Sequence, residues 1–228
     1  MSKVGRSSKA AACSVAALVT TSAAANTVED VQLWTTLSAS GSIKGDVVGQ
    51  MDLNARTSVD QRRVTQSLIR GTIGYRVTPS LTLSLGYGHI IGFRLNQDNL
   101  TEQRLYQQVQ WTLGKLGRGT VSTRIRVEQR FVRPSNDAGW RYRQQLRYQL
   151  PLREAGPALI VQVEPFFAIN STDWGARAGF DQVRVMAGAN IPLAKSLAIE
   201  TGYQLQYVRG AVSDRANHIV PITLSWRF

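Results

Sequence analysis

Cysteine, histidine, lysine and long apolar runs are all scarce in this chain of 228 residues. The single cysteine, Cys13, lies within the first 25 residues, so the remainder has no thiol for a disulfide or a cysteine metal site. With two histidines and no further cysteine, we expect no metal site and no other cofactor. Beyond residue 25, no apolar run reaches the roughly 20 residues that a membrane-spanning helix needs, which excludes a helical membrane protein.

The first 25 residues have the three parts of a secretory signal peptide. Lys3, Arg6 and Lys9 give a basic start, residues 10–19 are small or apolar, and residues 23–25 are alanines that suit a cleavage site. We therefore expect residues 1–25 to be a signal peptide and residues 26–228 to form one exported domain. Without the three cations of the signal peptide, the formal charge falls from +12 to +9, and nearly all the remaining cations are arginines.

Apolar and polar residues alternate with a period of two along most of residues 26–228. Leu81, Leu83 and Leu85, for example, are separated by Thr82 and Ser84. This period is typical of strands, and the runs have about the 9–11 residues with which a tilted strand crosses a bilayer. Tight turns alternate with mostly longer polar loops, as in outer-membrane barrels. The expected strands are 31–40, 46–56, 64–76, 81–93, 102–113, 120–133, 140–150, 158–169, 180–191, 197–208 and 218–228.

These patterns predict an all-β fold, a transmembrane antiparallel up-and-down β-barrel in the outer membrane of a Gram-negative bacterium. The last strand is amphipathic, and we expect Trp226 and Phe228 to be the insertion signal that the barrel-insertion machinery recognises. Bacterial barrels have even strand numbers, so the eleven segments lead us to expect ten or twelve strands. Aromatic residues lie in the apolar phase near strand ends, where barrels have interfacial girdles: Tyr75, Trp111, Phe131, Trp140, Tyr203, Tyr207 and Trp226.

Short motifs along the chain, in a fixed order, resemble a known family. They are residues 32–34 (QLW), 85–87 (LGY), 102–104 (EQR), 126–131 (RVEQRF), 141–143 (RYR), 146–148 (LRY), 164–167 (EPFF), 180–184 (FDQVR) and 202–203 (GY). On these motifs the chain resembles the outer-membrane barrel family called domain of unknown function 2490 (DUF2490). The resemblance covers nearly all of residues 26–228. It implies an outer-membrane barrel and implies no activity or functional residue.

The polar phase of the strands carries a dense set of charges that the barrel would place on its inner wall. Charges in a narrow lumen must pair, so one interpretation is a structural arginine–glutamate network that plugs the barrel. The other is a porin-like, arginine-lined path for small polar or anionic solutes. The residues are Glu102, Arg104, Arg124, Arg126, Glu128, Arg130, Arg141, Arg143, Arg147, Glu164, Gln182 and Arg184.

Two further hypotheses belong to other functional classes. If Arg76 pairs with Ser80 around the turn at residues 77–79, Ser67 lies opposite His89 on the outer wall, where the pair could serve a lipid hydrolase. No carboxylate in that phase orients the histidine, so the residues favour a protein that is not an enzyme. A secreted soluble β-sandwich that binds an acidic polymer is the other alternative. The expected partners are outer-membrane lipid and lipopolysaccharide, the insertion machinery and small anions, and no nucleic acid, because export separates the chain from it.

Overall fold

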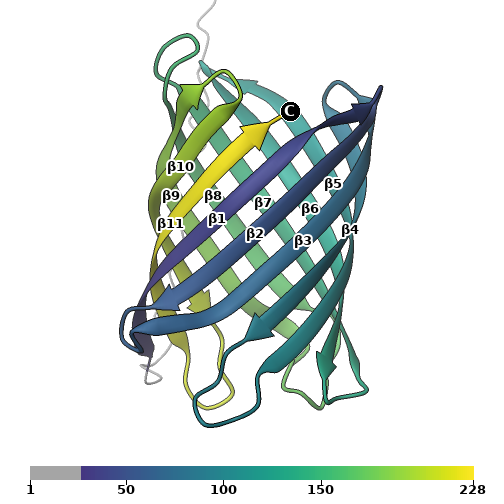
Figure 1. Ribbon diagram of the computed structural model, residues 1–228, viewed down its shortest axis with the longest axis vertical. Helices are drawn as coiled ribbons and strands as arrows, with labels where there is room; N and C mark the ends of the chain where they lie inside the picture. The colour runs from purple at the N-terminus through teal and green to yellow at the C-terminus, as the bar shows by residue number, and fades with distance from the viewer. Residues whose placement is uncertain (1–26) are drawn as a thin grey trace, which may run out of the picture.

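The computed structural model describes residues 27–228, which form one closed β-barrel of eleven strands (Figure 1). The all-β barrel expected from the alternation is confirmed, whereas the expected signal peptide falls outside the described residues. Among residues 27–228, no helix is long and apolar enough to cross a membrane. The strands are β1 (Val28–Lys44), β2 (Val47–Ser58), β3 (Arg63–Thr78), β4 (Leu81–Gly92), β5 (Leu100–Leu116), β6 (Gly119–Arg133), β7 (Ala138–Pro151), β8 (Ala158–Ala168), β9 (Gly179–Ala194), β10 (Leu197–Val208) and β11 (Arg215–Arg227).

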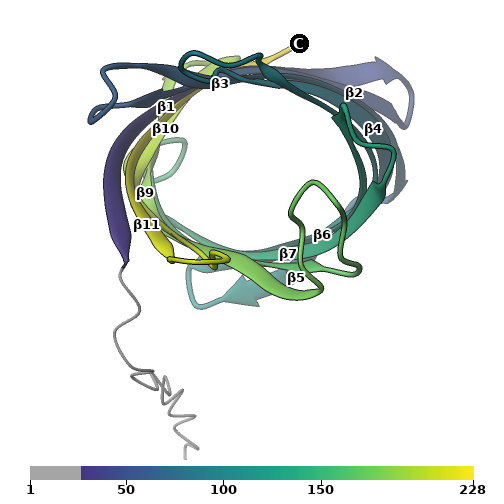
Figure 2. The ribbon, with the colours of Figure 1, turned by 90° about the horizontal axis from the view of Figure 1, so that it is seen from below.

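The barrel closes through a parallel pair, β1 with β11, while every other neighbouring pair is antiparallel. The parallel ladder runs from Val28 opposite Arg215 to Ser40 opposite Arg227. The expectation of ten or twelve strands was therefore wrong. An even number is needed only when all neighbours are antiparallel, and a parallel seam lets all eleven segments join one wall, which forms a closed ring in Figure 2.

The two ends of the barrel differ in their connections. At one end, which we call the turn end, the connections are residues 45–46, 79–80, 117–118, 152–157 and 195–196. At the other, the loop end, they are residues 59–62, 93–99, 134–137, 169–178 and 209–214. Gly45 and Gly117 have φ values of 56° and 59° and supply the left-handed residue that these tight turns need. The parallel seam places the start of β1 at the loop end and the end of β11 at the turn end.

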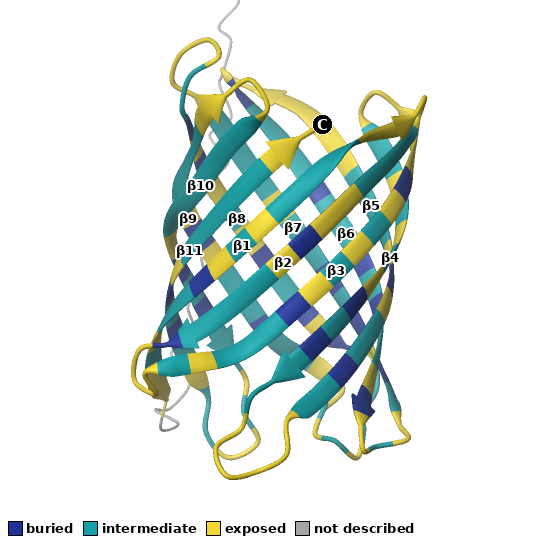
Figure 3. Cartoon of the chain, in the orientation of Figure 1, coloured by how far each residue is buried: buried dark blue, intermediate teal, exposed yellow. Residues whose placement is uncertain are grey.

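The wall has its apolar side outward and its charged side inward. On the outside, Leu85 and Val161 have exposed fractions of 59% and 54%, whereas on the inside Glu128 and Arg143 have 1% and 5%. Exposed and less exposed residues alternate along several strands (Figure 3). Successive side chains of a strand point to opposite faces, so the alternation in the sequence fixes this division. The alternative of a two-sheet sandwich was wrong, because the sheet is a single closed barrel whose apolar phase is exposed.

A glycine on β4 makes room for a large aromatic side chain in the lumen. Gly86 lies directly opposite Tyr106 of β5, and a Cβ atom at Gly86 would lie 2.1 Å from the Cζ atom of Tyr106. The tyrosine ring therefore lies across the glycine, and its hydroxyl is 2.7 Å from Oγ1 of Thr72. This arrangement fixes Tyr106 against the inner wall, where the guanidinium carbon of Arg126 is 4.0 Å from its ring centroid.

Candidate functional site

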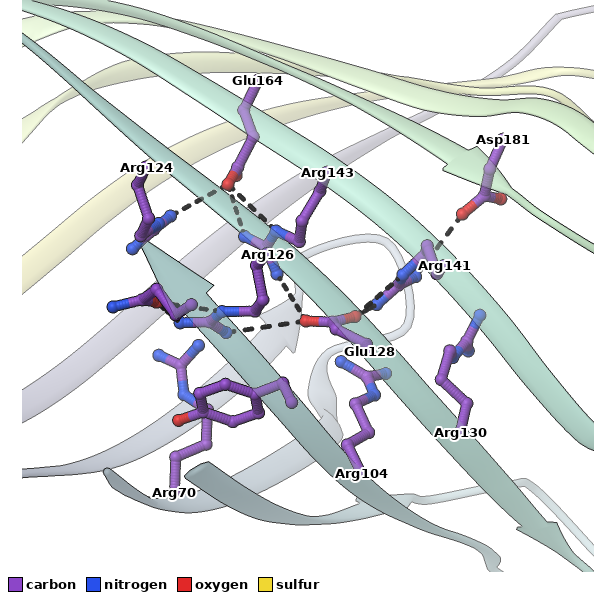
Figure 4. Close-up of polar contacts among 12 residues, drawn as sticks. Arg70, Arg104, Arg124, Arg126, Glu128, Arg130, Arg141, Arg143, Glu164 and Asp181 are labelled. Atoms are coloured by element: carbon purple, nitrogen blue, oxygen red, sulfur yellow. Dashed lines mark hydrogen bonds and ion pairs between the residues drawn. The ribbon is translucent and has the colours of Figure 1, made fainter. Parts of the chain in front are cut away.

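Three glutamates at the waist of the barrel each bind more than one arginine. Glu102, Glu128 and Glu164 are all buried, and together they pair with six guanidinium groups. Figure 4 shows the pairs of Glu128 and Glu164. The arginines come from the three adjacent strands β5, β6 and β7, whose polar phase faces the lumen. They are Arg104, Arg124, Arg126, Arg130, Arg141 and Arg143.

Glu128 is the centre of this network. Its carboxylate accepts hydrogen bonds from Arg141 at 2.6 and 2.9 Å and from Arg143 at 3.2 Å, and Arg126 lies 3.5 Å away. The strand register explains the need for it, because Arg126 and Arg143 stand directly opposite each other on β6 and β7. Like charges at such a position repel, and a carboxylate shared between them removes the repulsion.

Glu164 shares Arg143 with Glu128, whereas Glu102 holds a separate pair of arginines. Glu102 holds Arg104 at 2.7 Å and Arg130 at 2.5 Å, a second pair of arginines directly opposite in the sheet. Glu164 of β8 uses one oxygen, Oε1, for Arg143 at 2.7 Å and Arg124 at 2.9 Å.

Further ion pairs continue the network around the wall. Arg147 reaches Glu200 at 2.7 Å, and Arg70 reaches Asp52 at 3.2 Å. Luminal ion pairs are thus distributed around most of the barrel.

Three cavities lie along the lumen: two of them meet at a partition, and the third, of about 290 Å³, lies nearer the turn end. The loop-end cavity has a volume of about 580 Å³, and the inner cavity has about 320 Å³. Three residues line both cavities and form the partition, namely Trp34, Arg143 and Arg184. Arg143 belongs to both the partition and the glutamate network, and a solute that moved from one of these two cavities to the other would pass Trp34 and the two arginines.

Two arginines beside the partition have no acidic partner among residues 27–228. Arg184 makes no hydrogen bond or ion pair there, and its guanidinium carbon lies 4.9 Å from the ring centroid of Trp34 and 4.7 Å from that of Phe166. Arg56 lies 3.7 Å from the centroid of Trp34 and donates only to Oδ1 of Asn54, at 3.3 Å. Two arginines without an acidic partner among the described residues thus meet at Trp34.

A relay of hydrogen bonds holds Trp34 in place. Its Nε1 donates to Oε1 of Gln32 at 2.8 Å, Nε2 of Gln32 donates to Asp30 at 2.6 Å, and the hydroxyl of Ser58 donates to the same carboxylate at 2.8 Å. The relay joins β1 to β2 on the inner wall. It gives the indole ring a fixed position in the lumen, where the guanidinium groups of Arg56 and Arg184 contact it.

Contacts of their own side chains hold two of the connections at the loop end. Trp174, in the connection between β8 and β9, lies 4.8 Å from the guanidinium carbon of Arg130, and its Nε1 donates to the carbonyl of Asp137 at 3.1 Å. In the neighbouring loop, the Asp214 carboxylate accepts hydrogen bonds from the Tyr207 hydroxyl and from the Gly210 N–H. These bonds, with the Tyr207 hydroxyl foremost, lower the pKa of Asp214.

Comparison with known proteins places the chain in a family. The model of the family described as "Protein of unknown function (DUF2490)" matches residues 31–217. The chain belongs to the DUF2490 family. An uncharacterized protein of Methylorubrum extorquens is 33% identical to it over 209 residues, which are 90% of this chain and 91% of the relative.

Among solved structures, the crystal structure of the siderophore receptor PirA from Pseudomonas aeruginosa is similar to part of this DUF2490 chain. The two are 16% identical, with a TM-score of 0.34, and the match covers 73% of this chain. It covers 33% of the receptor, so the chain spans about a third of that receptor's length.

All twelve charged and polar residues predicted for the inner wall of this DUF2490 barrel lie there. Ten of them line the two cavities, and the other two, Glu102 and Glu128, are buried in the ion-pair network. The sequence analysis missed three luminal aromatic residues, Trp34, Tyr106 and Phe166. Each of them is an even number of residues from the polar, inward-facing residues of its strand, so strict alternation predicts that it faces the lumen.

The outer wall does not hold the predicted pair of Ser67 and His89. Ser67 stands opposite Ile91, and His89 stands opposite Ile69, so the two lie one step apart on the diagonal with no hydrogen bond between them. The prediction of directly opposite residues was wrong because the turn consists of residues 79–80 and the ladder has a bulge between Arg76 and Thr78.

The outer histidine that does have a side-chain partner is on β11. Nδ1 of His218 lies 2.7 Å from the Tyr203 hydroxyl, and its Nε2 is 3.9 Å from Glu29. A tyrosine hydroxyl is the only nucleophile in this contact, and we assign it no chemistry.

Proposed function

We propose that this protein is a bacterial outer-membrane β-barrel that admits small anions into an arginine-lined lumen with a narrow waist. The observation that carries the proposal is the inverted wall, with apolar side chains exposed and ion pairs buried. Such a wall would aggregate in water but suits a bilayer, in which every backbone hydrogen bond must be closed within the sheet. The exposed apolar band would meet membrane lipid and lipopolysaccharide.

The distribution of charge supports an anionic solute. The loop-end cavity is lined by arginines of β2, β5, β6, β7 and β9, and two of the arginines at its inner boundary have no acidic partner among residues 27–228. An arginine surplus in a narrow, weakly solvated space raises the local concentration of anions and repels cations. The partition at Trp34 would limit passage to small solutes.

A second candidate function is a closed structural barrel that passes no solute. The observation in its favour is the shared-carboxylate network, in which three glutamates and six arginines fill the waist. Barrels of few strands are commonly filled by side chains in this way. The two candidates share a location and differ in conductance.

Membrane fractionation tests the location. We expect the protein in the outer-membrane fraction, released only by detergent, and recovery in the soluble periplasm would contradict the proposal. Replacing Trp226 and Phe228 by alanine tests the proposed insertion signal, and we expect the variant to accumulate outside the membrane. The two side chains are exposed and their rings lie 5.5 Å apart at the turn end.

Conductance in planar bilayers tests the channel. We expect small, anion-selective currents, with Trp34→Ala increasing the conductance because the indole forms part of the partition. Arg184→Glu should weaken anion selectivity, whereas Arg94→Glu, the same change in an exposed loop, should leave it unchanged. Purified protein that never conducts, even as the Trp34→Ala variant, would contradict the channel and favour the closed barrel.

A further inference from the structure

We propose that Arg56 and Arg184 form a binding site for a small oxyanion, beside Trp34 at the floor of the loop-end cavity. The shared chemistry is an anion with at least two acceptor oxygens, as in phosphate or a dicarboxylate. The inference deepens the proposed function by assigning a site to the anion, and it rests on that function only for the anion's route of entry. Binding itself does not require that the barrel conduct.

The surroundings of Arg184 provide the first argument. In the sheet, Arg184 stands directly opposite Glu164, its natural partner, yet Oε1 of Glu164 binds Arg143 and Arg124 instead. Arg184 turns to the faces of two aromatic rings, and its buried Nε has no acceptor among the described residues. A buried guanidinium nitrogen without an acceptor is costly, and an anion in the adjoining cavity would supply the missing charge.

The second argument is that Arg56 reaches the same ring, that of Trp34, from a strand that is not a neighbour of β9. It belongs to β2 and Arg184 to β9, but both contact the ring of Trp34 and both line the loop-end cavity. Two cations at one indole repel each other, so their proximity needs a compensating negative charge. Planar guanidinium groups are suited to two-pronged recognition of phosphate and carboxylate oxygens.

The acids of the cavity do not provide that charge. Asp30 is occupied by Ser58 and Gln32, and Asp181 pairs with Arg141 at 3.4 Å. Glu29 and Asp60, the other two acids of the lining, are exposed at the start of β1 and in the loop after β2. None of the four forms an ion pair with Arg56 or Arg184 within residues 27–228.

The cavity also has the size and rigidity of a binding site. Its volume of about 580 Å³ exceeds the need of a phosphate ion and falls within the range of roughly 300–1,000 Å³ usual for small-molecule pockets. The relay from Ser58 through Asp30 and Gln32 fixes Trp34, the platform on which both arginines rest. A preformed site of this kind loses little entropy when a ligand binds.

Isothermal titration of the full-length protein in detergent tests the site, with inorganic phosphate and succinate as separate probes at low ionic strength. We expect saturable binding of at least one probe. Arg56→Gln and Arg184→Gln should each weaken it about tenfold or more, the loss of a charged hydrogen bond. The probe that binds more tightly distinguishes a phosphate-type from a dicarboxylate ligand.

Arg130→Gln is the matched control. Arg130 lines the same cavity and its loss changes the net charge equally, but it is paired with Glu102, which retains Arg104. We expect this variant to lose clearly less affinity than either Arg56→Gln or Arg184→Gln. Equal weakening in all three variants, or no saturable binding of either probe to the wild type, would overturn the site.

Thermal unfolding and conductance measurements separate effects on folding and on conduction from effects on anion binding. Because Arg184 makes no ion pair or hydrogen bond, we expect Arg184→Gln to fold, and its thermal unfolding curve establishes this before titration. Wild-type protein that binds phosphate through these two arginines but conducts nothing would refute the channel and support the site. Anion currents without saturable binding would refute the site and support the channel.

Discussion

The lumen has fewer carboxylates than arginines, and Glu128 is the carboxylate that pairs with the most arginines. Three arginines approach it within 3.5 Å, and a second glutamate, Glu164, shares one of them. Burial of each charge is unfavourable by itself, so the network is stable only while every carboxylate serves several guanidinium groups. Arg184, by contrast, is a charge without a carboxylate partner among the described residues.

At the residue scale, Glu128→Gln should destabilise the barrel by about 3–5 kcal/mol, because it leaves buried arginines without a counter-charge. Glu200→Gln is the matched control, since Glu200 binds only Arg147 and both side chains are partly exposed. We expect a clearly smaller loss for it. Urea unfolding of the purified protein in detergent or liposomes measures both, and equal losses would show that the sharing of Glu128 has no energetic weight.

At the scale of elements, each strand contributes a fixed face, while the contacts between strands depend on glycines. Gly86 of β4 gives Tyr106 its position, and Gly119 of β6 accommodates Tyr148 in the same manner, since its Cβ would lie 2.3 Å from that ring. On β9 and β10, Gly188 and Gly202 stand directly opposite each other. These glycines let the sheet bend and let aromatic side chains lie flat on the wall.

Gly86→Ala should therefore destabilise the protein by about 1–3 kcal/mol, as overpacking does, because the new methyl group overlaps the ring of Tyr106. Gly71→Ala on the adjacent strand β3 is the control. A Cβ atom there meets nothing within 4 Å, so we expect no loss, or a gain of about 0.5–1 kcal/mol from the less flexible unfolded chain. Denaturant midpoints of the two variants measure the difference, and a loss for Gly71→Ala as large as that for Gly86→Ala would contradict this explanation.

For the whole molecule, the parallel seam has a topological consequence. If the turn end faces the periplasm, as short turns do in outer-membrane barrels, then the start of β1 lies at the cell surface together with the long loops. The C-terminal strand ends on the periplasmic side. Both ends of the described chain would lie on the same side only in a barrel with an even number of strands.

Cysteine labelling of intact cells tests this topology. In a Cys13→Ser background, we expect a membrane-impermeant maleimide to label Glu29→Cys at the start of β1 and Asp98→Cys in a loop. Ser80→Cys, in the turn between β3 and β4, should be labelled only after the cells are lysed. Labelling of Asp98→Cys but not of Glu29→Cys in intact cells would contradict the parallel seam.

The alternation of residue types determined the strands and the face of each side chain. All eleven segments expected from period two are strands, and the arginines and glutamates expected on the inner wall line the lumen. The physical reason is local, because a strand sends successive side chains to opposite faces whatever its neighbours are. The family, too, was recognisable from short motifs, as the match over residues 31–217 confirms.

Only the tertiary structure decided which strands meet and which charges pair. The parallel closure, the two-residue turn that separates Ser67 from His89, and the bond between Arg147 and Glu200 depend on registers between distant segments. Several arginines lie within reach of each carboxylate, so the sequence does not determine which arginine lacks a carboxylate partner. The structure shows that Arg56 and Arg184 do, because the geometry of the wall gives Glu164 to Arg143 and Arg124 and turns Arg184 toward Trp34.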